Sequence, residues 1–180
     1  MNVYYLLLGS NTGNRLCYLR DACRDLCETG EIPAVSAVYE TSPWGYELQA
    51  PFLNCAVKLQ TQRPPLDLLN ILKNIEKNIG RTTNFRWGPR VIDIDILLFN
   101  DSIHHTPTLQ IPHPRLAERR FALVPLAEIA AGAQHPLLKK TIAQLLVECS
   151  DTGSVKLLIT GAEFYAKVFV SESIPTNGET

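Results

Sequence analysis

Residues 90–97 read Arg-Val-Ile-Asp-Ile-Asp-Ile-Leu, and this alternation of apolar and acidic side chains predicts a β-strand over residues 91–99. Successive side chains of a strand point to opposite faces of a sheet. The three isoleucines therefore cover one face, while Asp93 and Asp95 lie together on the other, about 7 Å apart at ~3.3 Å of rise per residue. The strand predicts a hydrophobic core on one side of a sheet and a carboxylate pair on the opposite side.

Five further elements are predicted upstream of this strand. Apolar runs rich in β-forming residues predict strands, and apolar residues at helical spacing predict helices. Proline is tolerated in the first turn of a helix, and glycine commonly follows its last turn. The strands are predicted over 3–8, 34–40 and 52–60, and the helices over 14–29 and 64–79. The order β-α-β-β-α-β predicts an α+β fold with a ferredoxin-like core, in which helices pack on an antiparallel sheet.

The pattern downstream of residue 99 is weaker. A long loop is followed by short helical turns and by a final predicted helix near residues 142–149. Residues 154–170 contain two runs that favour β-strands. We expect one domain over residues 1–158 and a C-terminal extension over residues 159–180, whose role is open between an oligomer contact and disorder.

Composition excludes several classes of protein. The chain has 180 residues, a net charge of −1, 46% hydrophobic and 19% charged residues, which is typical of one globular domain without general affinity for nucleic acid or for a membrane surface. No targeting or membrane-spanning segment is recognisable. Five cysteines without a CxxC pair favour a reducing compartment. We therefore expect a cytoplasmic protein, a monomer rather than an oligomer, with small-molecule ligands.

Basic residues bracket the two aspartates. A carboxylate pair is costly without compensating cations, and magnesium prefers such oxygen ligands. Guanidinium groups bind phosphate oxygens in a fork, and phosphoryl transfer needs mainly positioning and charge neutralisation. The arginines in question are Arg81, Arg86, Arg90, Arg115, Arg119 and Arg120. The combination favours a site for phosphoryl transfer, and the alternative is a strand whose outer face is merely solvated.

Aromatic residues and one histidine add further candidates. Trp44 and Trp87 lie in predicted loops, where core packing does not require tryptophan, and a flat heteroaromatic ligand would stack between such rings. Asn54 lies on the same strand face as Phe52 and offers a donor and an acceptor to the edge of a ring. The alternative is that these are ordinary core residues. His113, between two prolines, is a candidate for phosphate contact or proton transfer, or is structural.

Several segments, in this order, resemble a known family. They are residues 8–13 (Leu-Gly-Ser-Asn-Thr-Gly), 39–45 (Tyr-Glu-Thr-Ser-Pro-Trp-Gly), 52–54 (Phe-Leu-Asn), 75–76 (Ile-Glu) with 80–81 (Gly-Arg), 86–95 (Arg-Trp-Gly-Pro-Arg-Val-Ile-Asp-Ile-Asp), 111–115 (Ile-Pro-His-Pro-Arg) and 119–121 (Arg-Arg-Phe). Together they make the chain similar to the 6-hydroxymethyl-7,8-dihydropterin pyrophosphokinases of folate biosynthesis. The resemblance extends to about residue 158.

The resemblance implies a reaction and its cofactors. A member of this family transfers pyrophosphate from ATP to 6-hydroxymethyl-7,8-dihydropterin and releases AMP and the pterin diphosphate. ATP would be the co-substrate, and two Mg²⁺ ions would be bound by Asp93 and Asp95. An RNA-binding or ligand-sensing module would instead predict basic and aromatic strands and a basic net charge. A metal-dependent nuclease would need further carboxylates and a basic groove.

The resemblance also assigns roles to individual residues. The catalytic residues would be Arg81, Arg90, Asp93 and Asp95. The ATP-binding residues would be Lys73, Glu76, Arg81, Trp87, Arg90, Ile96, His113 and Arg119. The pterin-binding residues would be Thr41, Pro43, Trp44, Phe52, Asn54, Trp87 and Phe121. Arg81 would lie on a loop that closes over the site. Many members carry an arginine where this chain has Thr83, which concerns the behaviour of the loop rather than the reaction.

Overall fold

The computed structural model describes residues 1–81 and 88–170, so the predictions for Thr83, Arg86, Trp87 and the chain end after residue 170 lie outside the described residues. The strands are β1 (Asn2–Ser10), β2 (Glu31–Val35), β3 (Val38–Thr41), β4 (Phe52–Thr61), β5 (Asp93–Phe99), β6 (His104–His105), β7 (Gln110–Ile111) and β8 (Val155–Ile159). The helices are α1 (Arg15–Cys27), α2 (Pro65–Ile79), the 3₁₀ turn η1 (Leu116–Glu118), α3 (Arg120–Ala130), α4 (Ile142–Glu148) and α5 (Gly161–Phe169).

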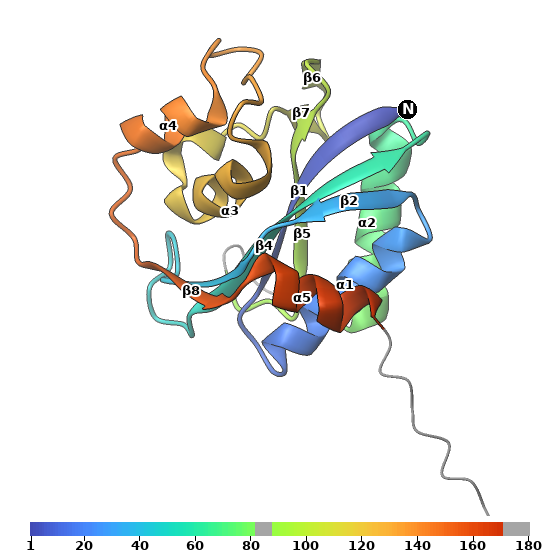
Figure 1. Cartoon of the computed structure of the whole chain (residues 1–180), viewed down its shortest axis with the longest axis vertical. Helices are drawn as coiled ribbons and strands as arrows, with labels where there is room; N and C mark the ends of the chain where they lie inside the picture. The colour runs from blue at the N-terminus through green and yellow to red at the C-terminus, as the bar shows by residue number, and fades with distance from the viewer. Residues whose placement is uncertain (82–87, 171–180) are drawn as a thin grey trace, which may run out of the picture.

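One antiparallel sheet organises the molecule (Figure 1). Its strand order is β5-β1-β4-β3-β8, with β2 also paired to β4. β1, the strand before α1, pairs with β4 on one side and with β5 on the other. β4, the strand before α2, lies at the centre of the strand order. This order, with α1 and α2 as the connections, confirms the predicted ferredoxin-like α+β fold.

The strand predicted over residues 34–40 is in fact two strands, β2 and β3, because the chain leaves the ladder at Ser36. The Ser36 hydroxyl accepts from the Ala56 amide at 2.8 Å and donates to the Ala37 carbonyl at 2.7 Å. A buried serine side chain thus replaces part of the backbone ladder, which satisfies polar groups that a bent strand would leave unpaired. The prediction of one continuous strand was wrong for this reason.

Helices cover the two faces of the sheet unequally. α1, α2 and α5 lie on one face, whereas α3 and α4 lie on the other (Figure 1). The larger core, under α1, α2 and α5, contains Ile92, Ile94 and Ile96, as the alternation in β5 predicts. The second core, under α3 and α4, contains Leu7, Ala56 and Leu97. This second core covers only part of its face, and the uncovered part carries the site described below.

Helix ends follow local sequence signals. The side chain of Asn14 accepts from the amide of Cys17 at 3.4 Å and caps α1. α2 begins at Pro65, where the missing amide proton costs no helical hydrogen bond. It ends at Gly80, whose φ of 110° suits a residue without a side chain. The polypeptide therefore leaves α2 in a fixed direction, toward Arg81 and the site.

The segment after residue 154 differs from its prediction. Its first β-like run is β8, which pairs with β3 and extends across residue 158, but the second run forms the helix α5. Thr160 and Glu163 form a capping box at the start of α5. Phe164 and Val168, four residues apart, are 0% and 4% exposed in the larger core. Burial at helical spacing outweighs the β propensity of these residues. The helix predicted near residues 142–149, which is α4, is therefore not the last helix, because α5 follows it.

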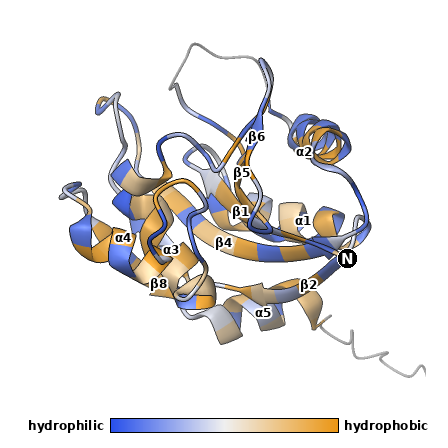
Figure 2. Cartoon of the chain, turned by 90° about the horizontal axis from the view of Figure 1, so that it is seen from above, coloured by the Kyte–Doolittle hydropathy of each residue, from blue (hydrophilic) through white to orange (hydrophobic). Residues whose placement is uncertain are grey.

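The hydropathy of the helices agrees with this layered arrangement. Apolar residues of α1, α2 and α3 face the sheet (Figure 2). Across residues 1–81 and 88–170, no helix combines the length and the apolar character that crossing a membrane requires.

Candidate active site

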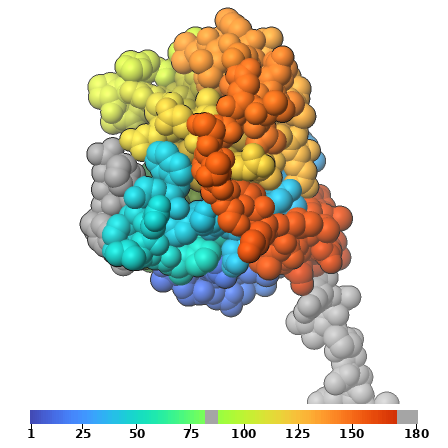
Figure 3. All heavy atoms as spheres, turned by 90° about the vertical axis from the view of Figure 1, so that its left-hand side faces the viewer, coloured from blue at the N-terminus to red at the C-terminus, as the bar shows by residue number. Residues whose placement is uncertain are grey.

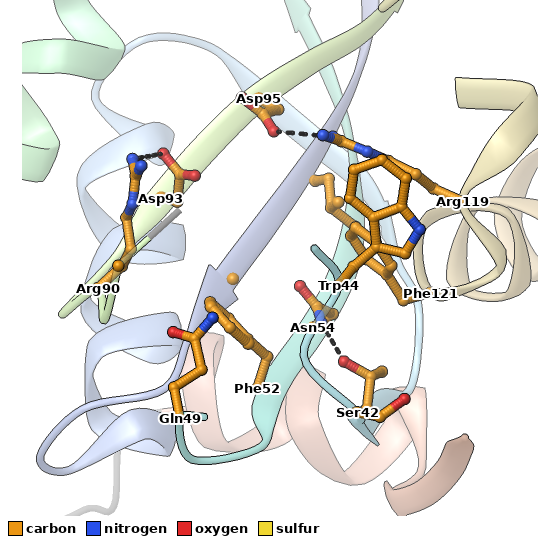
Figure 4. Close-up of a pocket in the computed structure, with 14 residues that line it drawn as sticks. Ser42, Trp44, Gln49, Phe52, Asn54, Arg90, Asp93, Asp95, Arg119 and Phe121 are labelled. Carbon is orange, nitrogen blue, oxygen red and sulfur yellow. Dashed lines mark hydrogen bonds and ion pairs between the residues drawn. The ribbon is translucent and has the colours of Figure 1, made fainter. Parts of the chain in front are cut away.

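The site lies on the part of the sheet that α3 and α4 leave uncovered. Leu7 on β1 is paired in register with Ala56 on β4 and Asp95 on β5, and two residues further along β1, Gly9 is paired with Asn54 and Asp93. Because side chains repeat every second residue on one face, the strand face that is apolar under the helices becomes polar beyond them. A cavity of about 110 Å³ opens there (Figure 4).

Gly9 is required at this position by its neighbour. A Cβ at residue 9 would lie 2.7 Å from the Asn54 side-chain oxygen, which is closer than such atoms approach. The bare backbone of β1 therefore leaves room for the Asn54 amide at the floor of the cavity. The Asn54 side-chain nitrogen donates to the Thr41 hydroxyl at 2.8 Å, and this bond fixes the amide orientation with its oxygen on the side of Gly9.

The acidic end of the cavity is a network of alternating charges. Arg81 bonds to Asp93 at 2.6 Å and also forms an ion pair with Glu76. Arg90 lies 3.5 Å from the same Asp93 oxygen (Figure 4). Lys73 reaches both oxygens of Glu76 at 3.0 Å. Three cations thus neutralise two carboxylates that come from a helix and from the neighbouring strand.

Glu76 links α2 to β5. Its side chain is 2% exposed, and it accepts from the amide of Ile94 at 2.8 Å. Burial raises its pKa, although Lys73 and the hydrogen bond from Ile94 oppose the change. Because one carboxylate holds the helix, the strand and Arg81, the position of Arg81 relative to Asp93 is set by the fold.

Asp95 is the less neutralised of the two strand carboxylates. Among the described residues, its ion-pair partner is Arg119, at 3.9 Å. Burial, followed by repulsion from Asp93, raises the pKa of Asp95 to about 7, although Arg119 and Lys73 act in the opposite direction. A carboxylate in this position gains from a cation bound beside it, because the cation would favour the ionised form and so oppose both causes of the shift.

Arg119 and His113 form a basic wall next to Asp95. The Arg119 Nη1 atom lies 3.3 Å from His113 Nε2, and His113 Nδ1 accepts from the amide of Arg115 at 3.2 Å. Burial, and then the charges of Arg119 and Arg115, lower the pKa of His113 to about 4, so this imidazole is neutral at pH 7. Within the described part of the chain, the buried Nε of Arg119 finds no hydrogen-bond partner, which leaves a donor for a ligand.

The other end of the cavity is aromatic. Trp44 and Phe121 lie near Arg119, and Phe52 lies across from them, with Asn54 between (Figure 4). The Arg119 guanidinium is 4.9 Å from the centre of the Trp44 ring and 5.6 Å from that of Phe121, distances at which a cation attracts an aromatic face. Arg119 therefore belongs to both ends of the cavity, because it contacts Asp95 on one side and two rings on the other.

Asn11 holds together the loops that border the cavity. Its side-chain nitrogen donates to Gln49 at 2.9 Å and to the Ala50 carbonyl at 3.1 Å. Its side-chain oxygen accepts from the Arg90 amide at 2.7 Å. One buried amide thus connects the turn after β1, the loop between β3 and β4, and the start of β5.

The structure brings most of the predicted residues together. Those that line the cavity are Thr41, Trp44, Phe52, Asn54, Arg90, Asp93, Asp95, Arg119 and Phe121. Lys73, Glu76, Arg81 and His113 adjoin it through the ion pairs and hydrogen bonds above. Pro43 lines a smaller neighbouring cavity. Ile96 lies in the larger core, on the sheet face opposite to the aspartates.

Sequence reasoning missed Leu7, Ser42, Gln49 and Gly88, which also line the cavity. Leu7 could have been found from the alternation in β1, because it shares a face with Gly9. Ser42 and Gln49 lie in a loop without periodicity, and their placement depends on partners far along the chain. Ser42 belongs to the segment 39–45 that carries part of the family resemblance, but no local signal in the sequence shows that Ser42 or Gln49 lines the cavity.

Among residues 1–81 and 88–170, no group of three or more histidine, cysteine, aspartate or glutamate side chains could hold a metal ion. Asp93 and Asp95 remain a pair of oxygen ligands on one strand face. Magnesium commonly takes only one or two protein carboxylates and completes its shell with water and substrate phosphates. The donor set and its raised carboxyl pKa therefore fit such an ion.

The fold and the site together define a ferredoxin-like α+β protein with a carboxylate pair, basic groups and aromatic rings in one cavity. The model of the 7,8-dihydro-6-hydroxymethylpterin-pyrophosphokinase (HPPK) family matches residues 5–131. The chain belongs to this family.

Individual relatives agree with this assignment. The chain is 44% identical over 148 residues to a 2-amino-4-hydroxy-6-hydroxymethyldihydropteridine pyrophosphokinase of Aquifex aeolicus, covering 82% of this chain and 92% of the relative. It is 50% identical over 130 residues to the protein of the same name from Bacillus subtilis, covering 71% and 78%.

A solved structure shares the fold. The chain matches a Plasmodium falciparum HPPK-DHPS crystallised with pteroate, with a TM-score of 0.67 and 19% identity over 82% of this chain. The chain spans 44% of that longer protein.

Proposed function

We propose that this protein transfers a pyrophosphoryl group from ATP to the hydroxymethyl group of 6-hydroxymethyl-7,8-dihydropterin in folate biosynthesis, releasing AMP. Membership of the HPPK family supports this reaction. The observation that carries it in the structure is the position of Asp93 and Asp95, which lie on one strand face beside basic side chains, in the same cavity as a set of aromatic rings. A nucleotide polyphosphate and a flat heterocycle would meet at these two carboxylates.

Asp93 and Asp95 would hold Mg²⁺, with two ions expected. Bound there, Mg²⁺ neutralises phosphate charge and orients the oxygens of the reacting groups. Asp93 is at present balanced by Arg81 and Arg90. Once Asp93 serves as a metal ligand, both guanidinium groups would be available to the transferring phosphates.

The phosphate and nucleotide side would use the remaining basic groups. Nδ1 of the neutral His113 accepts from the Arg115 amide, so its proton is on Nε2, and Arg119 Nε is a buried donor without a partner among the described residues. Both can therefore donate to phosphate oxygens. Lys73 and Glu76 would border the nucleotide, whereas the side chain of Ile96 lies in the core on the opposite face of the sheet. Arg81 follows directly on Gly80, at the end of α2, and would act on the transferring group from that side. Positioning and charge account for most catalysis of phosphoryl transfer.

The pterin would lie between Phe52 and Phe121, with Asn54 at its edge. Asn54 is held by Thr41, and its side-chain oxygen remains an acceptor for a ring N–H or amino group. Pro43 and Trp44 would complete this end through the loop that follows β3. Trp87 would border both substrates. Stacking selects a flat ring and the fixed amide selects its hydrogen-bond pattern, so that the hydroxymethyl group is directed toward the carboxylates.

The arrangement supports a cytoplasmic monomer. The described residues of this chain line the cavity and form the ion pairs around it, and we propose that the protein acts as a monomer. All five cysteines are free thiols, which fits a reducing compartment.

The test is AMP formation from ATP and Mg²⁺ with and without 6-hydroxymethyl-7,8-dihydropterin. We expect AMP and the pterin diphosphate to form in equal amounts, and neither to form without the pterin or with EDTA. AMP release that does not depend on the pterin, or cleavage of a nucleic acid strand by the same preparation, would contradict the proposal.

A further inference from the structure

The linker between α4 and β8, residues 149–154, packs against the aromatic end of the cavity. In space-filling view it lies as an orange segment beside the cyan loop that follows β3 and the yellow segment that begins α3 (Figure 3). Asp151, Gly153 and Ser154 line a small cavity of about 30 Å³ together with Trp44 and Phe121. The linker therefore lines a small cavity together with two residues that also line the main cavity.

Asp151 caps α3 from a distance of 31 residues along the chain. Its Oδ2 atom accepts from the amide of Arg120, the first residue of the helix, at 2.9 Å. The residue that precedes the helix, Arg119, provides no side-chain cap. A carboxylate at the first turn satisfies a free amide and interacts favourably with the helix dipole. Phe121 is in this first turn, so Asp151 fixes the backbone that carries its ring.

The other oxygen of Asp151 orders the linker itself. Oδ1 accepts from the amide of Gly153 at 2.8 Å. The next residue, Ser154, then exchanges two hydrogen bonds with Ser42: its amide donates to the Ser42 hydroxyl at 3.0 Å, and its carbonyl accepts from the Ser42 amide at 3.0 Å. Through Ser42, the linker holds the loop that leads from Thr41 to Trp44.

Gly153 lies where the linker packs closely against the loop that carries Ser42. A Cβ at residue 153 would lie 3.0 Å from Asp151 Oδ1 and 3.1 Å from the Ser42 hydroxyl. Both contacts are tighter than ordinary van der Waals separation, so the two hydrogen-bonded groups meet at a residue that has no side chain. The joint between linker, α3 and the Ser42 loop is thus packed as well as hydrogen-bonded.

We infer that Asp151 is a positioning residue for the pterin end of the site. It acts through Phe121 on one side and through Ser42 and Trp44 on the other, and its described contacts are with the segments that carry these residues and with the linker itself. The inference rests on the proposed function, since it concerns the substrate that these rings would bind. It gives the segment beyond the family match, which ends at residue 131, a definite role in substrate binding.

The experiment compares Asp151→Ala with the wild-type protein in steady-state kinetics. We expect the KM for the pterin to rise by about five- to tenfold, the range that loss of one helix cap would produce, with kcat and the KM for ATP within about twofold. Asp151→Asn keeps an oxygen acceptor and should recover part of the pterin affinity. The pterin affinity can also be measured at equilibrium from the fluorescence of the pterin. It should decrease from the wild-type protein to Asp151→Asn to Asp151→Ala.

A matched control separates positioning from general stability. Thr160→Ala removes the cap of α5, which is far from the cavity, and should lower the melting temperature without changing the KM for the pterin. Equal effects of both substitutions on that KM, or a loss in Asp151→Ala that falls equally on ATP and pterin, would overturn the inference.

If Asp151→Ala does not fold, Gly153→Ala tests the same joint. The added methyl group meets Asp151 and Ser42, and the KM for the pterin should rise selectively; an unchanged value would overturn the inference. Failure of the proposed function is recognised separately, because the wild-type protein would then form no pterin-dependent AMP.

Discussion

The two ends of the cavity are built by different kinds of interaction. At the phosphate end, Glu76, Asp93 and Asp95 come from α2 and β5 and are surrounded by four basic side chains. At the pterin end, the rings are held by a buried amide, a helix cap and backbone hydrogen bonds between distant segments. The first end is held together mainly by ion pairs between charged side chains, whereas the second end is held together mainly by hydrogen bonds and by packing of aromatic rings.

The difference predicts how substitutions divide. A change at the phosphate end should alter turnover and its dependence on metal and pH, since charge develops there during the reaction. A change at the pterin end should alter the affinity for one substrate. Arg119, which contacts both Asp95 and the rings, should be the exception that affects both.

The largest effect is expected for Asp95→Asn. The amide keeps the shape of the side chain but removes a metal ligand, and we expect kcat to fall by at least roughly 10³-fold, the scale seen when one group that stabilises the transition state is lost. AMP release at saturating ATP and pterin measures this.

The fold of the Asp95→Asn protein should be intact. Burial and Asp93 already disfavour the charged form of Asp95, so without Mg²⁺ the melting temperature should be equal to or higher than that of the wild-type protein. A variant with near-normal turnover would contradict the assignment of Asp95 as a metal ligand, and an unfolded variant would contradict the expectation that the fold is unchanged.

The binding of Mg²⁺ should depend on pH around neutrality. The pKa of Asp95 is raised to about 7, so a proton competes with the metal below that value. We expect the apparent affinity for Mg²⁺ to weaken by up to about tenfold for each unit that the pH falls below 7. Calorimetric titration of the protein at pH 6, 7 and 8 measures this.

The same shift has a consequence for stability without metal. Because the folded-state pKa is above the ordinary value of an aspartate, Asp95 contributes stability at pH below about 4, and this contribution is lost as the pH rises to about 7. Thermal unfolding in EDTA should show this loss in the wild-type protein and not in Asp95→Asn. Parallel pH profiles of the two proteins would show that Asp95 titrates normally.

Local periodicity in the sequence predicted the arrangement of β5 at the phosphate end. The alternation in β5 was sufficient to place Ile94 in the core and both aspartates in the cavity, because strand periodicity is a local property. Ser42, Gln49 and Asp151 could not be predicted, because each acts through a partner far along the chain. The same reason explains α5, since its aromatic residues favour strands locally and become helical through burial of Phe164.

At the pterin end, Phe121→Ala should weaken pterin binding by about tenfold, which corresponds to the loss of one aromatic stacking contact. The KM for ATP should change little, because the neighbouring Arg119 stays capable of binding phosphate through its contacts with His113 and Asp95. Fluorescence titration with the pterin measures the affinity.

Tyr165→Ala is the matched control for Phe121→Ala, because Tyr165 is an aromatic residue on α5 that is 44% exposed. It should leave both substrate affinities unchanged. An unaltered pterin affinity in Phe121→Ala would assign Phe121 to the core instead.

The smallest effect on catalysis is expected for Phe164→Ala in α5, although its effect on stability should be large. Phe164 on α5 is 0% exposed in the core beneath the opposite face of the sheet. Phe164→Ala should lower the free energy of unfolding by about 3–5 kcal/mol, the usual cost of truncating a buried phenylalanine, while both KM values stay within about twofold at temperatures where the protein is folded. Chemical denaturation and kinetics on the same preparation measure the two quantities. A selective rise in the KM of one substrate would mean that α5 affects the cavity across the sheet. A loss of stability with unchanged KM values would mean that pterin binding depends on the linker before β8 and the loops beside it, and not on α5.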